Sequence, residues 1–197
     1  MTAERKAEAA ARRNNRGRPA WAKGRLELSA LFMFGWKHMN AAVEKIIGRL
    51  GLAPLPVEGG FFRRTWLSDE RQADGRPAAS QIWYLITEES FSALHRLDAP
   101  ERWEFRAGDT VEHVQLDPRD GSVRILNLNH DTAQTLVVPA GVWQGARLAI
   151  GPQLHRWALF ACKMSPAWDE KGFAPGRRDE LLPVFPAAAT VIKALTR

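Results

Sequence analysis

The sequence predicts an all-β protein of the sandwich or barrel class, with the turns of a jelly roll. Short apolar or alternating runs, the pattern of β-strands, follow one another from residue 60 to residue 164. Asp117-Pro-Arg-Asp-Gly121 predicts a hairpin, because Pro presets φ and Gly accepts a positive φ. Arg106-Ala-Gly-Asp109 and Pro139-Ala-Gly141 have the same turn chemistry, and such turns mark the corners at which a jelly roll reverses.

The individual elements can be assigned in chain order. A charge-balanced amphipathic pattern predicts a helix at 40–50. The predicted strands are 60–67, 80–87, 91–97, 101–106, 110–116, 122–128, 134–138, 143–150 and 155–164. No further strand is expected after residue 165, and 178–196 is predicted to be a short helix broken by Pro183 and Pro186.

The positive charge of the chain is concentrated at its beginning. The net charge is +6, and residues 1–38 alone hold nine Lys or Arg against three Glu, whereas 39–197 hold nineteen of each sign. We therefore expect 1–38 to be a basic, unstructured extension and 39–197 to be a single domain. Met39 opens the predicted helix and is a candidate native start. A neutral domain gives no reason to expect a nucleic acid as partner.

Composition and motifs exclude several other classes. The apolar run 26–36 is too short to span a bilayer, so no membrane partner is expected. Cys162, the one cysteine, rules out an internal disulfide, fits a reducing cytoplasm, and is expected to be a buried side chain rather than a nucleophile. Neither a Walker loop, a dinucleotide fingerprint nor a Gly-x-Ser-x-Gly elbow occurs, which leaves nucleotide and serine-hydrolase chemistry without support.

His95 and Glu101 form the most suggestive pair of polar residues. If 91–97 and 101–106 are neighbouring strands joined at Asp98-Ala-Pro100, the two side chains can lie side by side on one face. Imidazole and carboxylate suit a divalent transition metal, which would need a further ligand. Gln144, after the Pro139 turn, offers only an amide oxygen, a poor ligand for such a metal.

Four ordered motifs carry a family resemblance over about Leu50 to Phe185. They are Val57-Glu-Gly-Gly-Phe-Phe-Arg63, Phe91-Ser-Ala-Leu-His-Arg96, Glu101-Arg-Trp-Glu-Phe-Arg-Ala-Gly108 and Val138-Pro-Ala-Gly-Val-Trp-Gln144. Together they resemble the cupin superfamily, and more closely its DUF985 (Cupin_5) family. The resemblance implies a double-stranded β-helix jelly roll (RmlC-like) with a short helix at each end, and a homodimer.

The sequence departs from the general cupin pattern at the positions of metal ligands. Leu97 and Gln144 stand where that pattern has two further His ligands, and Glu104 stands where the DUF985 family often has His. The resemblance therefore implies no confident metal site. If a metal is bound, His95, Glu101 and either Gln144 or Glu104 are its expected ligands.

The resemblance and the strand pattern together predict a pocket inside the barrel. Trp103, Trp143, Phe105 and Trp83 are expected to form its apolar wall. Because Trp143 and Gln144 point to opposite faces of a strand, only one of them can face the cavity, and Gln144 is placed inward. Glu58, beside two glycines that permit close backbone approach, either faces the pocket or caps a turn. The predicted pocket residues are Glu58, His95, Glu101, Trp103, Glu104, Phe105, Trp143 and Gln144. His113, His130 and His155 are expected on the surface.

Three functions fit such a pocket. The first is binding of a small polar or sugar-like molecule, with aromatic walls and few polar groups. The second is a metal-free enzyme, similar to the cupin-fold sugar epimerases, in which His95 is the base and a carboxylate such as Glu101 orients it. The third is a metal-dependent enzyme. The sequence favours them in that order and names no substrate.

Overall fold

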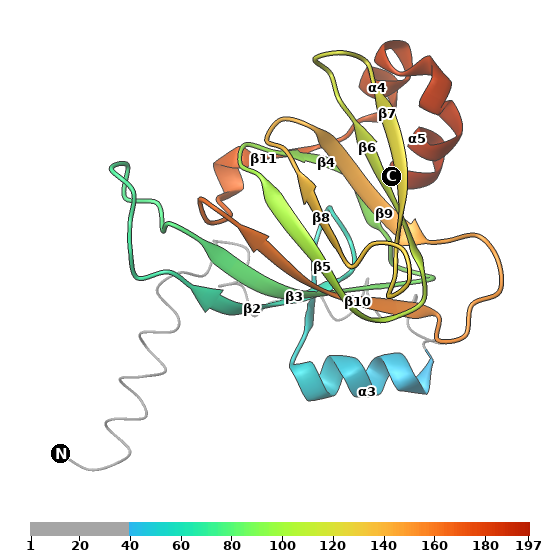
Figure 1. The fold of residues 1–197 in the computed structure, drawn as a ribbon, viewed down its shortest axis with the longest axis horizontal. Helices are drawn as coiled ribbons and strands as arrows, with labels where there is room; N and C mark the ends of the chain where they lie inside the picture. Colours follow the sequence, from blue (N-terminus) through green and yellow to red (C-terminus); the bar gives the residue numbers. More distant parts are fainter. Residues whose placement is uncertain (1–39) are drawn as a thin grey trace. The chain divides into compact units, whose positions relative to one another are not determined.

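The computed structural model describes residues 40–197, whose strands form two antiparallel sheets (Figure 1). The six-stranded sheet contains β1 (Ala53–Pro54), β2 (Phe61–Leu67), β3 (Ser80–Thr87), β10 (Trp157–Met164), β5 (Glu101–Gly108) and β8 (Thr135–Val138), in that order. The five-stranded sheet contains β11 (Phe173–Pro175), β4 (Ser92–Leu97), β9 (Trp143–Leu148), β6 (Val111–Leu116) and β7 (Val123–Leu128). The predicted extension at 1–38 and the candidate start at Met39 lie outside the described residues.

The strands predicted between residues 60 and 164 are all present, with ends that differ by at most two residues. The jelly-roll fold class is thus confirmed. The hairpin before β7 forms as expected, since the Gly121 amide donates to the Asp117 carbonyl and Gly121 has a φ of 73°. Helix α3 (Ala41–Leu50) follows Asn40, whose side chain accepts a hydrogen bond from the Ala42 amide and caps the helix.

The prediction that strands end at residue 165 was wrong. β11 pairs antiparallel with β4, opposite Leu97, Arg96 and His95. Its three residues are too few for a periodic pattern, and its Pro175 is tolerated because β11 is an edge strand. The strand returns the chain to the edge of the five-stranded sheet, beside the residues of the candidate site.

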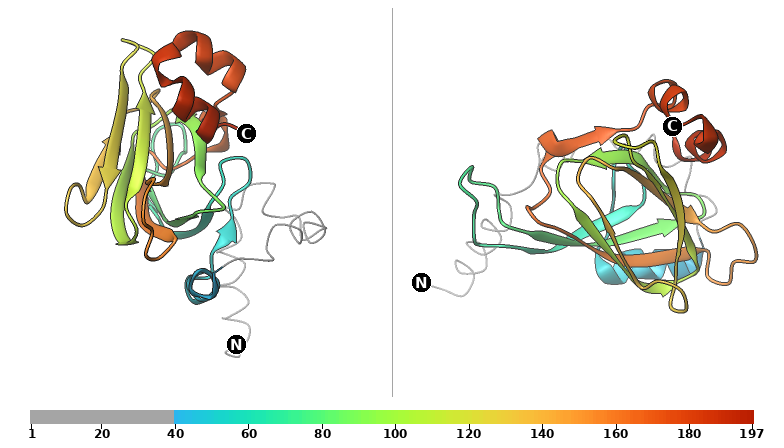
Figure 2. Two further views of the ribbon diagram at one scale, coloured as in Figure 1. Left: turned by 90° about the vertical axis from the view of Figure 1, so that its right-hand side faces the viewer. Right: turned by 45° about the horizontal axis from the view of Figure 1, so that its top comes forward.

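The C-terminal segment forms two helices rather than one. α4 (Arg178–Val184) keeps Pro183 within its last turn, and Pro186 opens the short 3-10 turn η3 (Pro186–Ala188) that leads into α5 (Ala189–Leu195). These helices cover the outer face of the five-stranded sheet (Figure 2). Trp143 belongs there to one apolar cluster with Leu181, Phe185 and Ile192.

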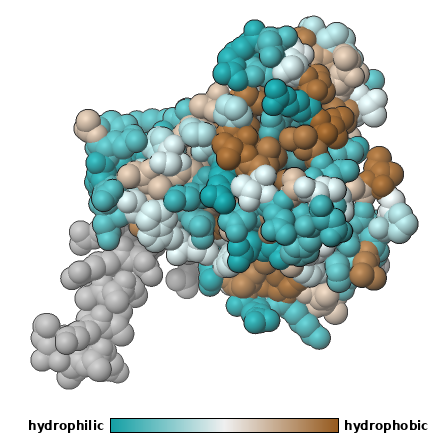
Figure 3. Space-filling model, in the orientation of Figure 1, coloured by the Kyte–Doolittle hydropathy of each residue, from teal (hydrophilic) through white to brown (hydrophobic). Residues whose placement is uncertain are grey.

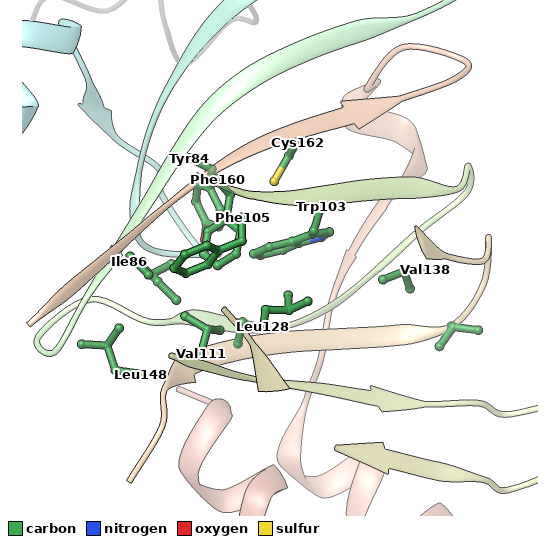
Figure 4. Packing of buried hydrophobic residues seen from close by; sticks show 13 residues of the cluster. Tyr84, Ile86, Trp103, Phe105, Val111, Leu128, Val138, Leu148, Phe160 and Cys162 are labelled. Atoms are coloured by element: carbon green, nitrogen blue, oxygen red, sulfur yellow. The ribbon is translucent and has the colours of Figure 1, made fainter. Parts of the chain in front are cut away.

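The space between the sheets holds the main core (Figure 4). Trp103 packs edge to face against Tyr84 and Phe160, with ring centroids 5.4 and 5.1 Å apart, and Phe105 does the same against Phe160 at 5.6 Å. The opposite sheet contributes smaller aliphatic side chains, which are Val111, Leu128, Ala146 and Leu148. Cys162 is buried in this core, as predicted, and burial raises the pKa of its thiol.

His95 and Glu101 do not lie on neighbouring strands of one sheet, contrary to the prediction. β4 belongs to the five-stranded sheet and β5 to the six-stranded sheet, so the chain crosses from one layer to the other at Asp98-Ala-Pro100. The two side chains approach from opposite sheets across the interior. The sequence shows where a turn lies, but not whether it joins strands within a sheet or between sheets.

On the face of the molecule shown in Figure 3, apolar side chains form separate patches among polar ones. Exposed apolar side chains occur on strands β7 and β8, at Ile125, Leu126 and Val137. Both strands lie at sheet edges. The predicted homodimer stays a prediction.

Candidate functional site

A pocket of about 610 Å³ opens beside the edge strand β11, between the loop that follows β1 and the beginning of α4. Its inner end carries two of the predicted site residues, Glu58 and His95. Phe173 and Leu182 supply apolar surface, while arginines lie among the remaining lining residues. The volume is in the range of pockets that hold small molecules.

The His95 ring is buried and held by two contacts. Nδ1 lies 2.8 Å from the Ala93 carbonyl oxygen, the ring stacks on Phe173 at 5.5 Å between centroids, and only 1% of the residue is exposed. Because a carbonyl oxygen only accepts, Nδ1 must carry the proton of a neutral ring. Nε2 is then a free base, and it lies 4.0 Å from Glu58 Oε2.

Glu58 is placed by the glycine-rich loop that follows it. The Ser92 hydroxyl donates to Glu58 Oε1 at 3.1 Å, and the Ala93 amide donates to the Glu58 carbonyl at 2.7 Å. Gly59 and Gly60 have φ values of 94° and 70°, which side chains rarely tolerate. A Cβ at Gly60 would lie 2.8 Å from the Leu85 carbonyl oxygen, so the bend depends on glycine. The pocket interpretation of Glu58 therefore fits its position.

Behind the pocket, Glu101 belongs to a buried hydrogen-bond network. Its Oε2 accepts from Trp103 Nε1 at 3.0 Å and from Gln144 Nε2 at 2.7 Å, and Gln144 Oε1 accepts from the same Trp103 nitrogen at 3.1 Å. Glu101 is 8% exposed and Gln144 is 1% exposed. In the sheet register Gln144 stands beside His95, which joins this network to the pocket. Gln144 faces inward, as predicted.

Burial is the main cause of the raised pKa of the Glu101 carboxyl. Loss of water, and then the nearby Glu58 carboxylate, raise the pKa of the Glu101 carboxyl from 4.5 to about 7, although His95 and the two hydrogen-bond donors oppose the rise. Near neutral pH both the protonated and the ionised form of this side chain are therefore populated. That behaviour is typical of a group in acid–base chemistry, although a structural carboxyl in an apolar core behaves in the same way.

His113 is the main interior residue that sequence reasoning missed. It was expected on the surface, but it is fully buried, and its ring meets Trp103 edge to face at 5.0 Å. Neither ring nitrogen has a hydrogen-bond partner among the described residues. Burial and the nearby His95 lower the pKa of His113 to about 3, and Gln144 only partly opposes this. Because helices cover the outer face of β6, both faces of that strand are buried and its polarity pattern is uninformative.

Several predicted pocket residues lie elsewhere. Glu104 is on the solvent side of β5, because Glu101, Trp103 and Phe105 occupy its inner face, and it pairs with Arg106 and Arg102. Trp143 faces the C-terminal helices instead of the interior. Phe105 and Trp103 do face inward, but they are core residues that do not line the pocket.

Trp83 also lies on the outer side of its sheet, beneath the Arg106 guanidinium. His130 and His155 are exposed, as predicted. The pocket thus brings together Glu58 and His95, with Glu101, Trp103 and Gln144 behind them. Ser92 lies within one of the family motifs but was not singled out, and the arginines of the pocket wall lie outside those motifs.

The candidate ligands do not fit a transition metal. Glu101 Oε2 and Gln144 Oε1 are both engaged with Trp103, and an amide oxygen is a weak ligand for such metals. Among residues 40–197, no three His, Cys, Asp or Glu side chains are grouped as a metal site.

The family model of the Cupin superfamily (DUF985) matches residues 44–175. The chain belongs to this family. The cupin is also similar to two solved structures, a hypothetical protein from Leishmania major and a protein from Shewanella oneidensis. The first shares 28% identity over 78% of this chain and 97% of its own, with a TM-score of 0.71. The second shares 27% identity over 81% of this chain and 99% of its own, with a TM-score of 0.72.

A cupin 2 domain-containing protein from Halorhodospira halophila shares the fold at a TM-score of 0.50 and 13% identity, over 73% of this cupin and 86% of its own chain. No curated protein matches closely enough to count as a relative. In the described part of this cupin, none of the helices is both long enough and apolar enough to cross a bilayer.

Proposed function

We propose that this cupin binds a small polar or sugar-like molecule in the pocket beside β11, with His95 and Glu58 as its inner contacts. The observation that carries the proposal is the position of these two residues at the inner end of the 610 Å³ pocket. His95 Nε2 and the Glu58 carboxylate offer acceptors for hydroxyl groups, whereas Phe173 offers an apolar face for a ring. Two polar acceptors beside an apolar ring suit a polyol or sugar.

The geometry of His95 supports a second function, acid–base catalysis without a metal. The Ala93 carbonyl holds Nδ1 and leaves Nε2 as the basic nitrogen on the pocket side. In the second function, His95 removes a proton from a bound carbon acid or hydroxyl, and Glu58 stabilises the imidazolium that forms. Glu101 was predicted from the sequence to orient His95, but the carboxylate beside His95 Nε2 is that of Glu58.

The experiment compares wild type with the variants H95Q and E58Q. Binding of neutral sugars and polyols is measured by nuclear magnetic resonance titration, and folding is followed by circular dichroism. We expect both variants to remain folded and to lose most of the affinity for any molecule that wild type binds. Wild-type affinity in both variants would contradict the proposal.

The matched control is H155Q, because His155 is an exposed histidine outside the pocket and its loss leaves the pocket unchanged. Turnover separates the two functions. If a bound sugar is epimerised or isomerised by wild type and not by H95Q, the acid–base function holds. If it is bound without reaction, the binding function holds.

A further inference from the structure

The outer wall of the pocket is positively charged. Arg177, Arg178 and Arg197 line it, against the two carboxylates of Glu58 and Asp179. Arg177 is neutralised, because it pairs with Asp179 at 2.9 Å and with Glu180 at 3.1 Å. Between residues 40 and 197, the other two arginines form no ion pair. Two unpaired guanidinium groups therefore face one pocket.

Arg178 is held in place by neutral acceptors only. Its Nε donates to the Thr196 hydroxyl at 2.9 Å, and its Nη2 donates to the carbonyl oxygens of Lys193 and Thr196, each at 3.0 Å. These bonds orient the guanidinium without neutralising it. They also tie Arg178 to Thr196, the residue before Arg197 in the chain.

Arg197 connects this wall to the inner contacts. Its guanidinium lies 4.9 Å from the centre of the Phe91 ring, and Nη2 donates to the Phe91 carbonyl at 3.3 Å. A Cβ at Gly59 would collide with Nη2 of Arg197, so the Arg197 guanidinium lies directly against Gly59, which follows Glu58 in the chain. A ligand that reaches Glu58 and His95 would therefore pass close to Arg197.

We infer that the ligand carries a phosphate or carboxylate group, which Arg178 and Arg197 bind at the mouth of the pocket while its polar body reaches His95 and Glu58. This inference rests on the proposed function, because it concerns the same pocket. Guanidinium groups match the oxygens of both anions, and pre-oriented ones lose less entropy on binding. The anion supplies the counter-charge that the two arginines lack.

The test uses matched probes on the full chain: D-glucose, D-gluconate, D-glucose 6-phosphate and inorganic phosphate. Titrations follow the Nε–Hε signals of the arginines by nuclear magnetic resonance. We expect at least one charged sugar to bind about tenfold or more tightly than glucose, as charge-assisted hydrogen bonds allow. The preferred probe distinguishes a phosphate from a carboxylate. Added salt should weaken this preference.

The variants R178Q and R197Q should each reduce the preference for charged probes. R49Q is the matched control, because Arg49 is exposed on α3 and does not line the pocket. R178K separates the effect of charge from the structural effect of losing the hydrogen bonds to Thr196, because lysine keeps the positive charge but lacks the planar guanidinium group. It should retain more of the preference than R178Q does.

The outcomes separate this inference from the proposed function. If glucose binds in a His95-dependent way and charged sugars bind no more tightly, the inference is overturned while the proposed function stands. If charged probes bind through the arginines but H95Q leaves their affinity unchanged, the anion site is supported and the proposed contact with His95 is refuted. If no charged probe shifts the signals of Arg178 or Arg197 at millimolar concentration, the inference is also overturned.

Discussion

Replacement of Glu101 by Gln should change how the stability of the protein depends on pH. Glu101 is buried, and the pKa of its carboxyl is raised from 4.5 to about 7. Between these values the folded protein holds a proton on Glu101 that the unfolded chain has released. Stability therefore falls as pH rises from 4.5 to 7, because folding must take up that proton.

The size of this loss of stability follows from the size of the rise in the pKa of Glu101. At about 1.4 kcal/mol for each pH unit, the change from 4.5 to about 7 corresponds to about 3 kcal/mol of lost stability above pH 7. Glutamine keeps an oxygen that accepts from Trp103 and Gln144, but it never ionises. The difference in unfolding free energy, E101Q minus wild type, should therefore grow by about 3 kcal/mol between about pH 4.5 and about pH 8.

Urea denaturation, followed by tryptophan fluorescence at several pH values, gives this difference directly. His113, whose pKa is lowered to about 3, makes stability rise with pH from 3 to 6.5, but it does so in both proteins and cancels. E104Q is the control, since it replaces a carboxylate by the same amide on the solvent side of the same strand. A difference for E101Q that stays constant with pH would refute the reasoning.

Three further predictions concern the fold around the pocket. G108A should lower the melting temperature more than G75A, because both glycines have a positive φ but only at Gly108 would a Cβ collide with the Trp157 carbonyl; equal losses would contradict this. The Cys162 thiol should react with a thiol reagent only after urea unfolds the protein, because it is fully buried and its pKa is raised; fast labelling of the folded protein would show otherwise. D109A should speed amide hydrogen exchange at Leu154, His155 and Arg156, whose three amides donate to the Asp109 carboxylate, while exchange within β6 should not change.

The sequence was most informative where one physical rule acts alone. Alternation and turn residues located the strands from β2 to β10, because strands end at turns and most of these turns contain Gly, Pro or Asp. Alternation showed that only one of Trp143 and Gln144 can face inward, and the family pattern, in which Gln144 takes a ligand position, selected Gln144. Neither the partners of each strand nor β11 could be predicted, since pairing depends on contacts between residues far apart in the chain.

The site was predicted only in part for related reasons. Glu58 and His95 were found because motifs carried them, although their closeness was not foreseen. His113 was misplaced since its strand is covered on both sides, and Glu104 was misplaced since its position was compared with a family pattern and not with the alternation of β5. Arg178 and Arg197 lie in a segment that carries no motif.

The return of the chain through β11 has a consequence for comparison with relatives. The family match ends at residue 175, yet Arg178, Leu182 and Arg197 of the pocket lining come after it. A match to the family model therefore describes only part of the pocket, and a ligand assigned to another member of the family would have to be tested on this chain itself.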